Sequence, residues 1–216
     1  AILFGYLIFC LTSVADAQVS MQIDNFSAAT NDRFFDDRSA DDLPFIGDGF
    51  DFSGVGRGNS WATLISSNVI ITSFHSRAAE TIRFYETNDP NGPFVERTIV
   101  NGDRIDENGT TDLYVARLNS PVPSTYQIYD FATERIVGNA AGDTLAGTFQ
   151  GSEVLTVGQS PTVQDRLIDV GIGENVISSY RENLVFGSNT DNDAIILAYD
   201  QPGSLTYQTH ESHVRG

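Results

Sequence analysis

The chain has 216 residues, of which 12 are basic and 29 acidic, so its formal net charge at pH 7 is −17. So large a negative charge argues against a nucleic-acid partner, because the chain has too few cations to neutralise phosphates. The only cysteine, Cys10, lies in an apolar N-terminal stretch, so the rest of the chain can form no disulfide within itself.

The N-terminal stretch has the features of an export signal. Residues Ala1 to Val14 form an almost unbroken apolar run that is followed by Ala15-Asp16-Ala17. Such a run with small residues at its end is typical of a secretory signal peptide, and it is short for a membrane-spanning helix. We therefore predict a signal peptide over residues 1–17, lacking its own start, and a secreted or periplasmic protein that leaves the membrane after cleavage.

Residues 18–51 are predicted to form an acidic N-terminal extension that lies on the protein surface. The segment is rich in Asp, Ser and Asn and has no sustained hydrophobic period. Its acidic pairs lack the Asp-x-Asp-x-Asp-Gly spacing of a calcium loop, so we interpret them as solvated. The expected anchors are phenylalanines: Phe34, Phe35, Phe45, Phe50 and Phe52.

From Val55 onward, short β-favouring runs alternate with Gly, Asn, Asp and Pro, which is the pattern of an all-β protein. After the run at Val55, strands are predicted at Trp61–Ile65, Val69–Thr72, Thr81–Thr87 and Phe94–Val100, and from Asp112 onward. Residues 66–68, 89–93 and 101–102 are predicted turns. Six strands before Pro121 would suffice for one antiparallel barrel.

Two segments of this region carry a recognisable pattern. The first contains Thr63-Leu64-Ile65-Ser66 and ends on Ile71-Thr72-Ser73-Phe74-His75; the second is Asp112-Leu113-Tyr114-Val115-Ala116. They resemble the histidine and aspartate segments of the trypsin-like (chymotrypsin-fold) serine proteases. The resemblance implies an all-β fold of two six-stranded antiparallel β-barrels, with His75 as general base and Asp112 as its orienting partner. The family commonly has Ala-Ala before the histidine and often Cys after it, whereas this chain has Ser73-Phe74 and Ser76.

Residues 52–121 are predicted to be the first barrel lobe and residues 122–216 a partial second lobe, joined at Pro121-Val122-Pro123. Gly147 to Gly151 resembles the Gly-aromatic-Gly strand that opens the second barrel of the family. The remaining strands are expected at Thr144–Phe149, Arg166–Val170, Leu184–Phe186 and Ala194–Tyr199.

The nucleophile of the family lies in a Gly-Asp-Ser-Gly motif that this sequence does not contain. The resemblance implies that the motif follows Gly216, so the chain as given is expected to be inactive. Ser204 is a poor substitute because Pro202-Gly203 before it reads as a turn and no glycine follows it. The segment before the motif lines the substrate pocket in the family, which makes Glu211, Ser212 and His213 weak substrate-binding candidates.

The sequence predicts no metal site and no cofactor, since the three histidines lack the His-Glu-x-x-His spacing. Our interpretation is a secreted bacterial-type serine endopeptidase, monomeric, whose partner is a peptide or protein substrate. The alternative is a non-catalytic homologue that serves as an extracellular binding module. An unrelated adhesive β-sandwich would predict tandem repeats and calcium-type Asp spacing, and the sequence has neither.

Overall fold

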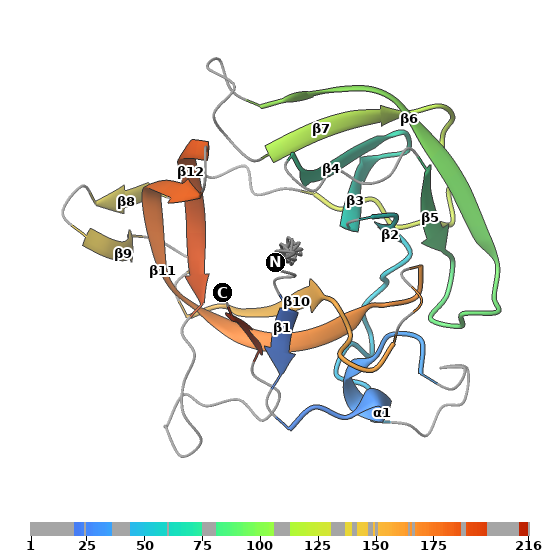
Figure 1. Ribbon diagram of the computed structural model, residues 1–216, viewed down its shortest axis with the longest axis horizontal. Coiled ribbons are helices and arrows are strands. Elements are labelled where there is room, and N and C mark those ends of the chain that lie inside the picture. Colours follow the sequence, from blue (N-terminus) through green and yellow to red (C-terminus); the bar gives the residue numbers. More distant parts are fainter. Residues whose placement is uncertain are drawn as a thin grey trace, which may run out of the picture.

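The computed structural model describes residues 20–23, 25–35, 44–59, 61–74, 81–105, 113–130, 137–139, 142–146, 149, 151–163, 165, 167–186, 189–197 and 212–215. Within these residues the secondary structure is almost entirely β, with one short helix, α1 (Ala28–Asn31). Six strands close into a barrel, and the other strands form small antiparallel sheets beside it (Figure 1). The predicted signal peptide, residues 1–17, lies outside the described residues.

The barrel is built from consecutive strands of the chain. They are β2 (Val55–Arg57), β3 (Trp61–Ser66), β4 (Val69–Ser73), β5 (Thr81–Tyr85), β6 (Phe94–Arg104) and β7 (Leu113–Leu118). Their order around the barrel is β2-β3-β4-β7-β6-β5, and β5 pairs with β2 to close it. All neighbours are antiparallel, so the prediction of one six-stranded antiparallel barrel is confirmed.

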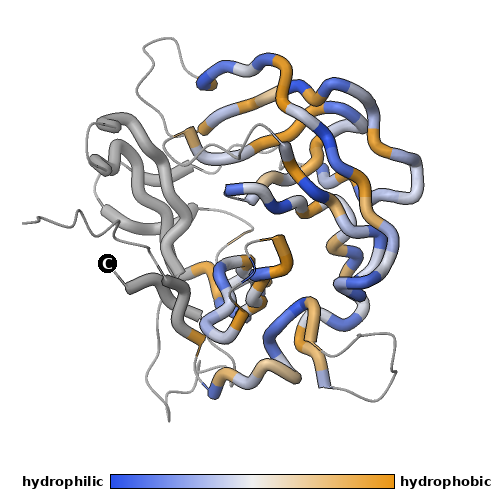
Figure 2. Tube along the Cα trace, turned by 45° about the vertical axis from the view of Figure 1, so that its right-hand side comes forward, coloured by the Kyte–Doolittle hydropathy of each residue, from blue (hydrophilic) through white to orange (hydrophobic). Residues whose placement is uncertain are grey.

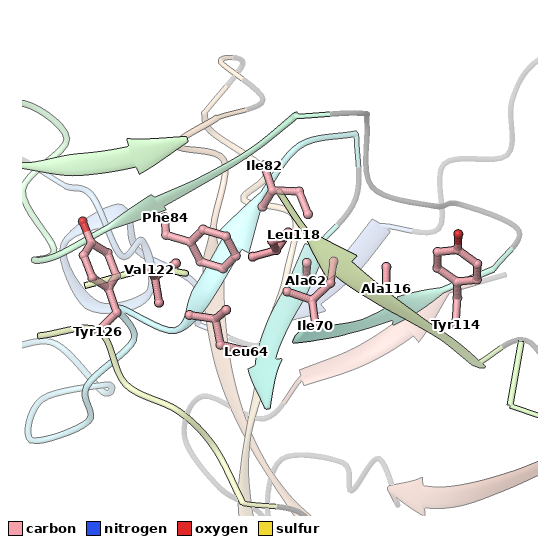
Figure 3. Close-up of a cluster of buried hydrophobic side chains, with 10 residues drawn as sticks. All are labelled: Ala62, Leu64, Ile70, Ile82, Phe84, Tyr114, Ala116, Leu118, Val122 and Tyr126. Carbon is pink, nitrogen blue, oxygen red and sulfur yellow. The ribbon is translucent and has the colours of Figure 1, made fainter. Parts of the chain in front are cut away.

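The barrel interior is filled by alternate residues of its strands. In β7, for example, Tyr114, Ala116 and Leu118 are buried while the residues between them are not. Period-two burial is what a strand with one face in a core requires, and Figure 2 shows apolar and polar positions interspersed along the chain of the barrel. The buried cluster comprises Ala62, Leu64, Ile70, Ile82, Phe84, Tyr114, Ala116, Leu118, Val122 and Tyr126. Figure 3 shows Val122 and Tyr126 at one end of this row and Tyr114 at the other.

Gly56 in β2 makes room for Phe84, the largest completely buried side chain of this interior. A Cβ on Gly56 would lie 2.5 Å from the Phe84 ring and 2.6 Å from Ile82. Both side chains are fully buried, so neither can move away without opening the core. The glycine is therefore required by packing and not by a turn.

The predicted turn at Asn101-Gly102 is wrong. β6 runs through both residues as an eleven-residue strand, and Asn101 and Gly102 pair with Arg117 and Ala116 of β7. The ladder shifts register between Ile99 and Asn101, which indicates a β-bulge. Asn-Gly favours a turn locally, but pairing with a neighbouring strand overrides that preference here.

The remaining strands form three small antiparallel sheets. β10 (Glu153–Gly158), β11 (Gly171–Phe186) and β12 (Asn189–Leu197) make one sheet in that order; β8 (Val137–Asn139) pairs with β9 (Gly142–Ala146), and β1 (Ser20–Ile23) pairs with β13 (Ser212–Arg215). The predicted strand at Thr144–Phe149 overlaps β9 as far as Ala146, but Phe149 lies in a turn in which its carbonyl accepts a hydrogen bond from the Ser152 N–H (3.0 Å). The prediction at Leu184–Phe186 falls in β11, and that at Ala194–Tyr199 overlaps β12 as far as Leu197. The sequence analysis missed β10.

The predicted strand at Arg166–Val170 is also wrong. Its described residues form a turn in which the Asp165 carboxylate accepts a hydrogen bond from the Leu167 N–H (3.0 Å), and β11 begins only at Gly171. Aspartate side chains commonly cap turns in this way, two residues ahead. The apolar residues Ile168 and Val170 are used instead as packing residues between sheet and barrel.

The N-terminal extension is more deeply packed than predicted. Asn31, Asp32 and Arg33 are all buried; the Asn31 amide donates to the Ile172 carbonyl (3.0 Å), and the Arg33 N–H donates to the Val170 carbonyl (2.9 Å). Of the predicted anchors, Phe34 and Phe52 are buried and Phe45 packs against them, whereas Phe50 is 60% exposed. The part of the extension from Asn31 to Phe34 thus contacts both the barrel and the start of β11.

Arg33 is the polar centre of this contact. Its side chain donates to the Asn88 amide oxygen (2.9 Å) and to the carbonyls of Val55 (3.2 Å), Tyr85 (3.2 Å) and Thr87 (3.3 Å). Burial lowers the pKa of the guanidinium to about 10, so it remains charged at neutral pH. A buried charge persists only where hydrogen bonds replace its hydration, which these four bonds do.

Replacing Arg33 by methionine should lower the free energy of unfolding by about 3 kcal/mol or more, because four hydrogen bonds from a charged donor are lost inside the protein. Arg117, an exposed arginine of β7, supplies the matched control. Arg117→Met should change stability by less than about 0.5 kcal/mol. Urea denaturation of both variants tests this, and equal losses would contradict the role given to Arg33.

Candidate active site

The two predicted catalytic residues, His75 and Asp112, lie outside the described residues, but the strands that lead to them are described. His75 follows Ser73, the last residue of β4, by two positions, and Asp112 directly precedes Leu113, the first residue of β7. The geometry of the two strand ends is therefore the structural basis of the candidate site.

β4 and β7 are neighbours in the barrel, and the end of β4 that leads to His75 pairs with the end of β7 that follows Asp112. The antiparallel register runs from Val69 opposite Arg117 to Ser73 opposite Leu113 (Figure 1). Opposite residues of an antiparallel pair have Cα atoms about 4.5–5.5 Å apart. The two chain segments that carry the predicted pair thus leave the barrel from one end of one strand pair.

The end of β6 completes this corner of the barrel. Arg104 is the register partner of Tyr114, and the Ile105 N–H donates to the Leu113 carbonyl (3.1 Å). Gly102 allows the Tyr114 side chain to cross β6, since a Cβ there would lie 2.6 Å from the Tyr114 ring. Three strand ends, those of β4, β6 and β7, therefore meet where the predicted site begins.

Phe74, the residue before His75, is held against this corner. Its ring is partly buried on the barrel core, with its centroid 6.0 Å from that of Tyr114. The Arg104 guanidinium carbon lies 3.5 Å from the Phe74 ring centroid, within the range of a cation–π contact. The phenylalanine that departs from the family pattern is accommodated here by specific contacts; nothing in the sequence marked Arg104 as its partner.

A second group of polar residues links the neighbouring part of the barrel to the sheet of β11. The Thr72 hydroxyl donates to the Trp61 carbonyl (2.7 Å), and the Arg57 guanidinium lies 4.0 Å from the centroid of the Trp61 ring. Arg57 also forms an ion pair with Asp169 (3.8 Å), and both side chains are buried. This junction fixes β3 and β4 relative to the segment before β11.

Asp169 is a buried carboxylate that the sequence analysis did not single out. Burial raises the pKa of this carboxyl, while the Ser160 N–H, which donates to it at 2.6 Å, and Arg57 act in the opposite direction. Asp32 lies close enough to raise it further. A single Asp in an irregular segment gives no sequence signal, because only the fold brings Arg57 to it.

A pocket of about 490 Å³ lies on a different part of the barrel surface. It is lined by Gly49, Phe50, Asp51, Phe52, Val55, Thr63, Gln127, Tyr129, Val154, Leu155 and Val157. Tyr129 donates its hydroxyl to the Asp51 carbonyl, and burial raises the pKa of Tyr129 to about 12. Its size and apolar walls suit a small-molecule site, and its described lining does not include the strand-end residues Phe74 and Leu113.

The three weak substrate-binding candidates occur near the C-terminal end of the described chain. Ser212 and His213 belong to β13 and pair with Ile23 and Gln22 of β1. Glu211 lies outside the described residues. The contact of β13 with an N-terminal strand was not predicted.

Neither a metal-ligand cluster nor a helix able to span a membrane occurs in the part of the chain that the structure describes. No three His, Cys, Asp or Glu side chains converge there as metal ligands. Its helical content is likewise too short and too polar to cross a lipid bilayer.

Comparison of the sequence with models of known protein families and with curated protein sequences gives no match. The resemblance to trypsin-like proteases therefore rests on the residues quoted in the sequence analysis.

A disulfide engineered between β4 and β7 would test the strand ends on which the candidate site depends. Ser73→Cys with Leu113→Cys, in a Cys10→Ser background, should form a disulfide on mild oxidation, because paired residues meet the required Cα separation. Ser73→Cys with Arg117→Cys is the control, since Arg117 lies four residues further along β7, roughly 13 Å away. Mass spectrometry distinguishes the two; failure of the first pair to oxidise would contradict the register.

Proposed function

We propose that this chain is part of an exported trypsin-like serine endopeptidase, with His75 as general base and acid and Asp112 as the residue that orients it. The nucleophilic serine is supplied by sequence after Gly216, and residues from 122 onward contribute to a second β-barrel lobe. The substrate is a peptide or protein, the enzyme acts as a monomer outside the cytoplasm, and no cofactor takes part.

The observation that carries this proposal is the pairing of Ser73 with Leu113 in a closed six-stranded antiparallel barrel. A serine hydroxyl becomes nucleophilic only when an imidazole can accept its proton and a carboxylate holds that imidazole in the right tautomer. This requires a histidine and an aspartate side by side. The register brings the segments that carry His75 and Asp112 to adjacent strand ends, which supports their assignment as that pair.

In the proposed reaction the serine oxygen attacks the carbonyl carbon of the scissile peptide while His75 takes the hydroxyl proton. His75 then gives this proton to the leaving amine as the C–N bond breaks, and an acyl-enzyme remains. A water molecule repeats the attack, with His75 again accepting and returning the proton. Asp112 stabilises the imidazolium in both halves without itself becoming protonated.

The proposed two-lobed form is supported by the polar junction beside the barrel. The ion pair between Arg57 and Asp169 joins the barrel to the segment before β11, and the described strands after residue 130 are antiparallel, as a second barrel of this family requires. Export is supported by the apolar run of residues Ala1 to Val14.

The competing proposal, a non-catalytic homologue that acts as a binding module, differs in one measurable property. It retains the barrel but has no nucleophile that reacts with a serine-directed probe. The intact protein, including the sequence that follows Gly216, separates the two: a folded protein that resists labelling by a phosphonate probe and leaves casein uncut would favour the binding module.

In the intact protein, Asp112→Asn should lower kcat by about 10⁴-fold, and His75→Ala by a similar or larger factor, because each removes the proton relay to serine. Asp103→Asn is the matched control for the carboxylate, since Asp103 is an exposed aspartate of β6, and it should leave kcat unchanged. Rates of casein hydrolysis and of phosphonate labelling measure the effect. Full activity of His75→Ala would refute the proposed mechanism.

A further inference from the structure

The residue before the proposed base, Phe74, contacts side chains from two other strands of the barrel. Phe74 is partly buried, and its ring contacts two side chains from two other strands. Tyr114 of β7 lies on one side, with 6.0 Å between ring centroids and 54° between ring planes. Arg104 of β6 lies over the ring, with its guanidinium carbon 3.5 Å from the centroid.

These three side chains are coupled through the barrel as well as through their own contacts. Arg104 and Tyr114 are register partners in the ladder between β6 and β7, and Thr72, two residues before Phe74, is the register partner of Tyr114. Tyr114 is 9% exposed and belongs to the barrel core. The Phe74 ring therefore packs against the barrel core through Tyr114.

We infer that Phe74 is a positioning residue for the proposed reaction, held by Arg104 and Tyr114 so that the chain presents His75 beside Asp112. The inference rests on the proposed function. Phe74 is one residue from His75, and Tyr114 is two residues from Asp112. One ring contact thus ties together the two segments whose relative position determines the proton relay.

No disulfide can hold the segment around Phe74 and His75 in place, because Cys10 is the only cysteine of the chain. The segment that carries the base must then be held by packing. A planar guanidinium over an aromatic ring, with a second ring at its edge, restricts the phenylalanine more than an aliphatic side chain would. Catalysis is sensitive to such restriction, since a misplacement of about 1 Å costs on the order of 10²-fold in rate.

The barrel contains a second contact of the same composition, which serves as a matched control. Arg83 lies over the Phe94 ring with its guanidinium carbon 4.1 Å from the centroid, and the Tyr85 ring centroid is 5.5 Å from that of Phe94. These residues belong to β5 and the beginning of β6, and not to the strand ends that lead to His75 and Asp112. A Phe94→Leu substitution therefore removes an equivalent ring without touching the candidate site.

The experiment uses the intact protein with Phe74→Leu, Phe74→Tyr, Arg104→Met and Phe94→Leu. Phe74→Leu should lower kcat by roughly 10- to 100-fold with KM within about twofold, because the relay is misplaced while substrate contacts remain. Arg104→Met should change kcat in the same direction, and Phe74→Tyr, which keeps the ring, should restore it. Phe94→Leu should leave kcat unchanged even where it lowers Tm. Equal effects of Phe74→Leu and Phe94→Leu on kcat would overturn the inference.

A second readout does not require turnover. In the wild type, a neighbouring carboxylate should raise the pKa of the His75 imidazole above its ordinary value of about 6.5, as followed by NMR of histidine-labelled protein. Phe74→Leu should move this pKa back toward the ordinary value, and Phe94→Leu should not. If the wild type resists the phosphonate probe, the proposed function fails, but the titration still tests whether Phe74 positions His75. A His75 pKa that is the same in the wild type and in Phe74→Leu overturns the inference.

Discussion

The requirement to fill a small closed barrel constrains everything else in this structure. Alternate residues of the six strands fill the interior, and Leu64, Ile70, Ile82 and Phe84 are completely buried. A shift of any strand by one residue would turn its apolar set outward, so the register is fixed by the core. The strand ends that lead to His75 and Asp112 take their relative position from this same register. The candidate site is a consequence of barrel packing.

Charged residues attach the rest of the chain to the barrel. Arg33 donates to carbonyls of β2 and β5 and to the turn after β5, and Arg57 pairs with Asp169 next to β11. Both guanidiniums lie against aromatic rings, those of Phe34 and Trp61. A chain without lysine and with no cysteine beyond its first residues thus uses arginine for its buried polar contacts, where the planar, multiply donating guanidinium is suited to satisfy several carbonyls at once.

The candidate site and the 490 Å³ pocket have different physical characters. The corner formed by β4, β6 and β7 is built of strand ends, a tilted pair of aromatic rings and a guanidinium over one of them, an arrangement suited to holding side chains in fixed positions. The pocket lined by Phe50, Phe52 and Val157 is apolar, and its Tyr129 phenol stays neutral through most of the pH range because its pKa is about 12.

The sequence alone predicted that the chain is a β-protein and where most of the strands between Val55 and Pro121 run, because alternation and turn residues are local properties of the chain. The closed antiparallel barrel was implied by the resemblance to the trypsin-like proteases. The prediction failed at Asn101-Gly102 and at Arg166–Val170, where pairing across the sheet or packing between layers overrides local preference. It also treated Arg33 and Phe34 as parts of a surface extension.

Only the tertiary structure decided the pairing of Ser73 with Leu113, the burial of Arg33, the meeting of Arg57 with Asp169 and the stacking of Arg104 on Phe74. Each of these contacts joins residues that are distant along the chain, and no single residue in them differs from an ordinary polar or aromatic side chain. The sequence could name His75 and Asp112 as candidates because their flanking residues form a pattern. That their segments leave the barrel side by side depends on the register, which is set by the filling of the whole core.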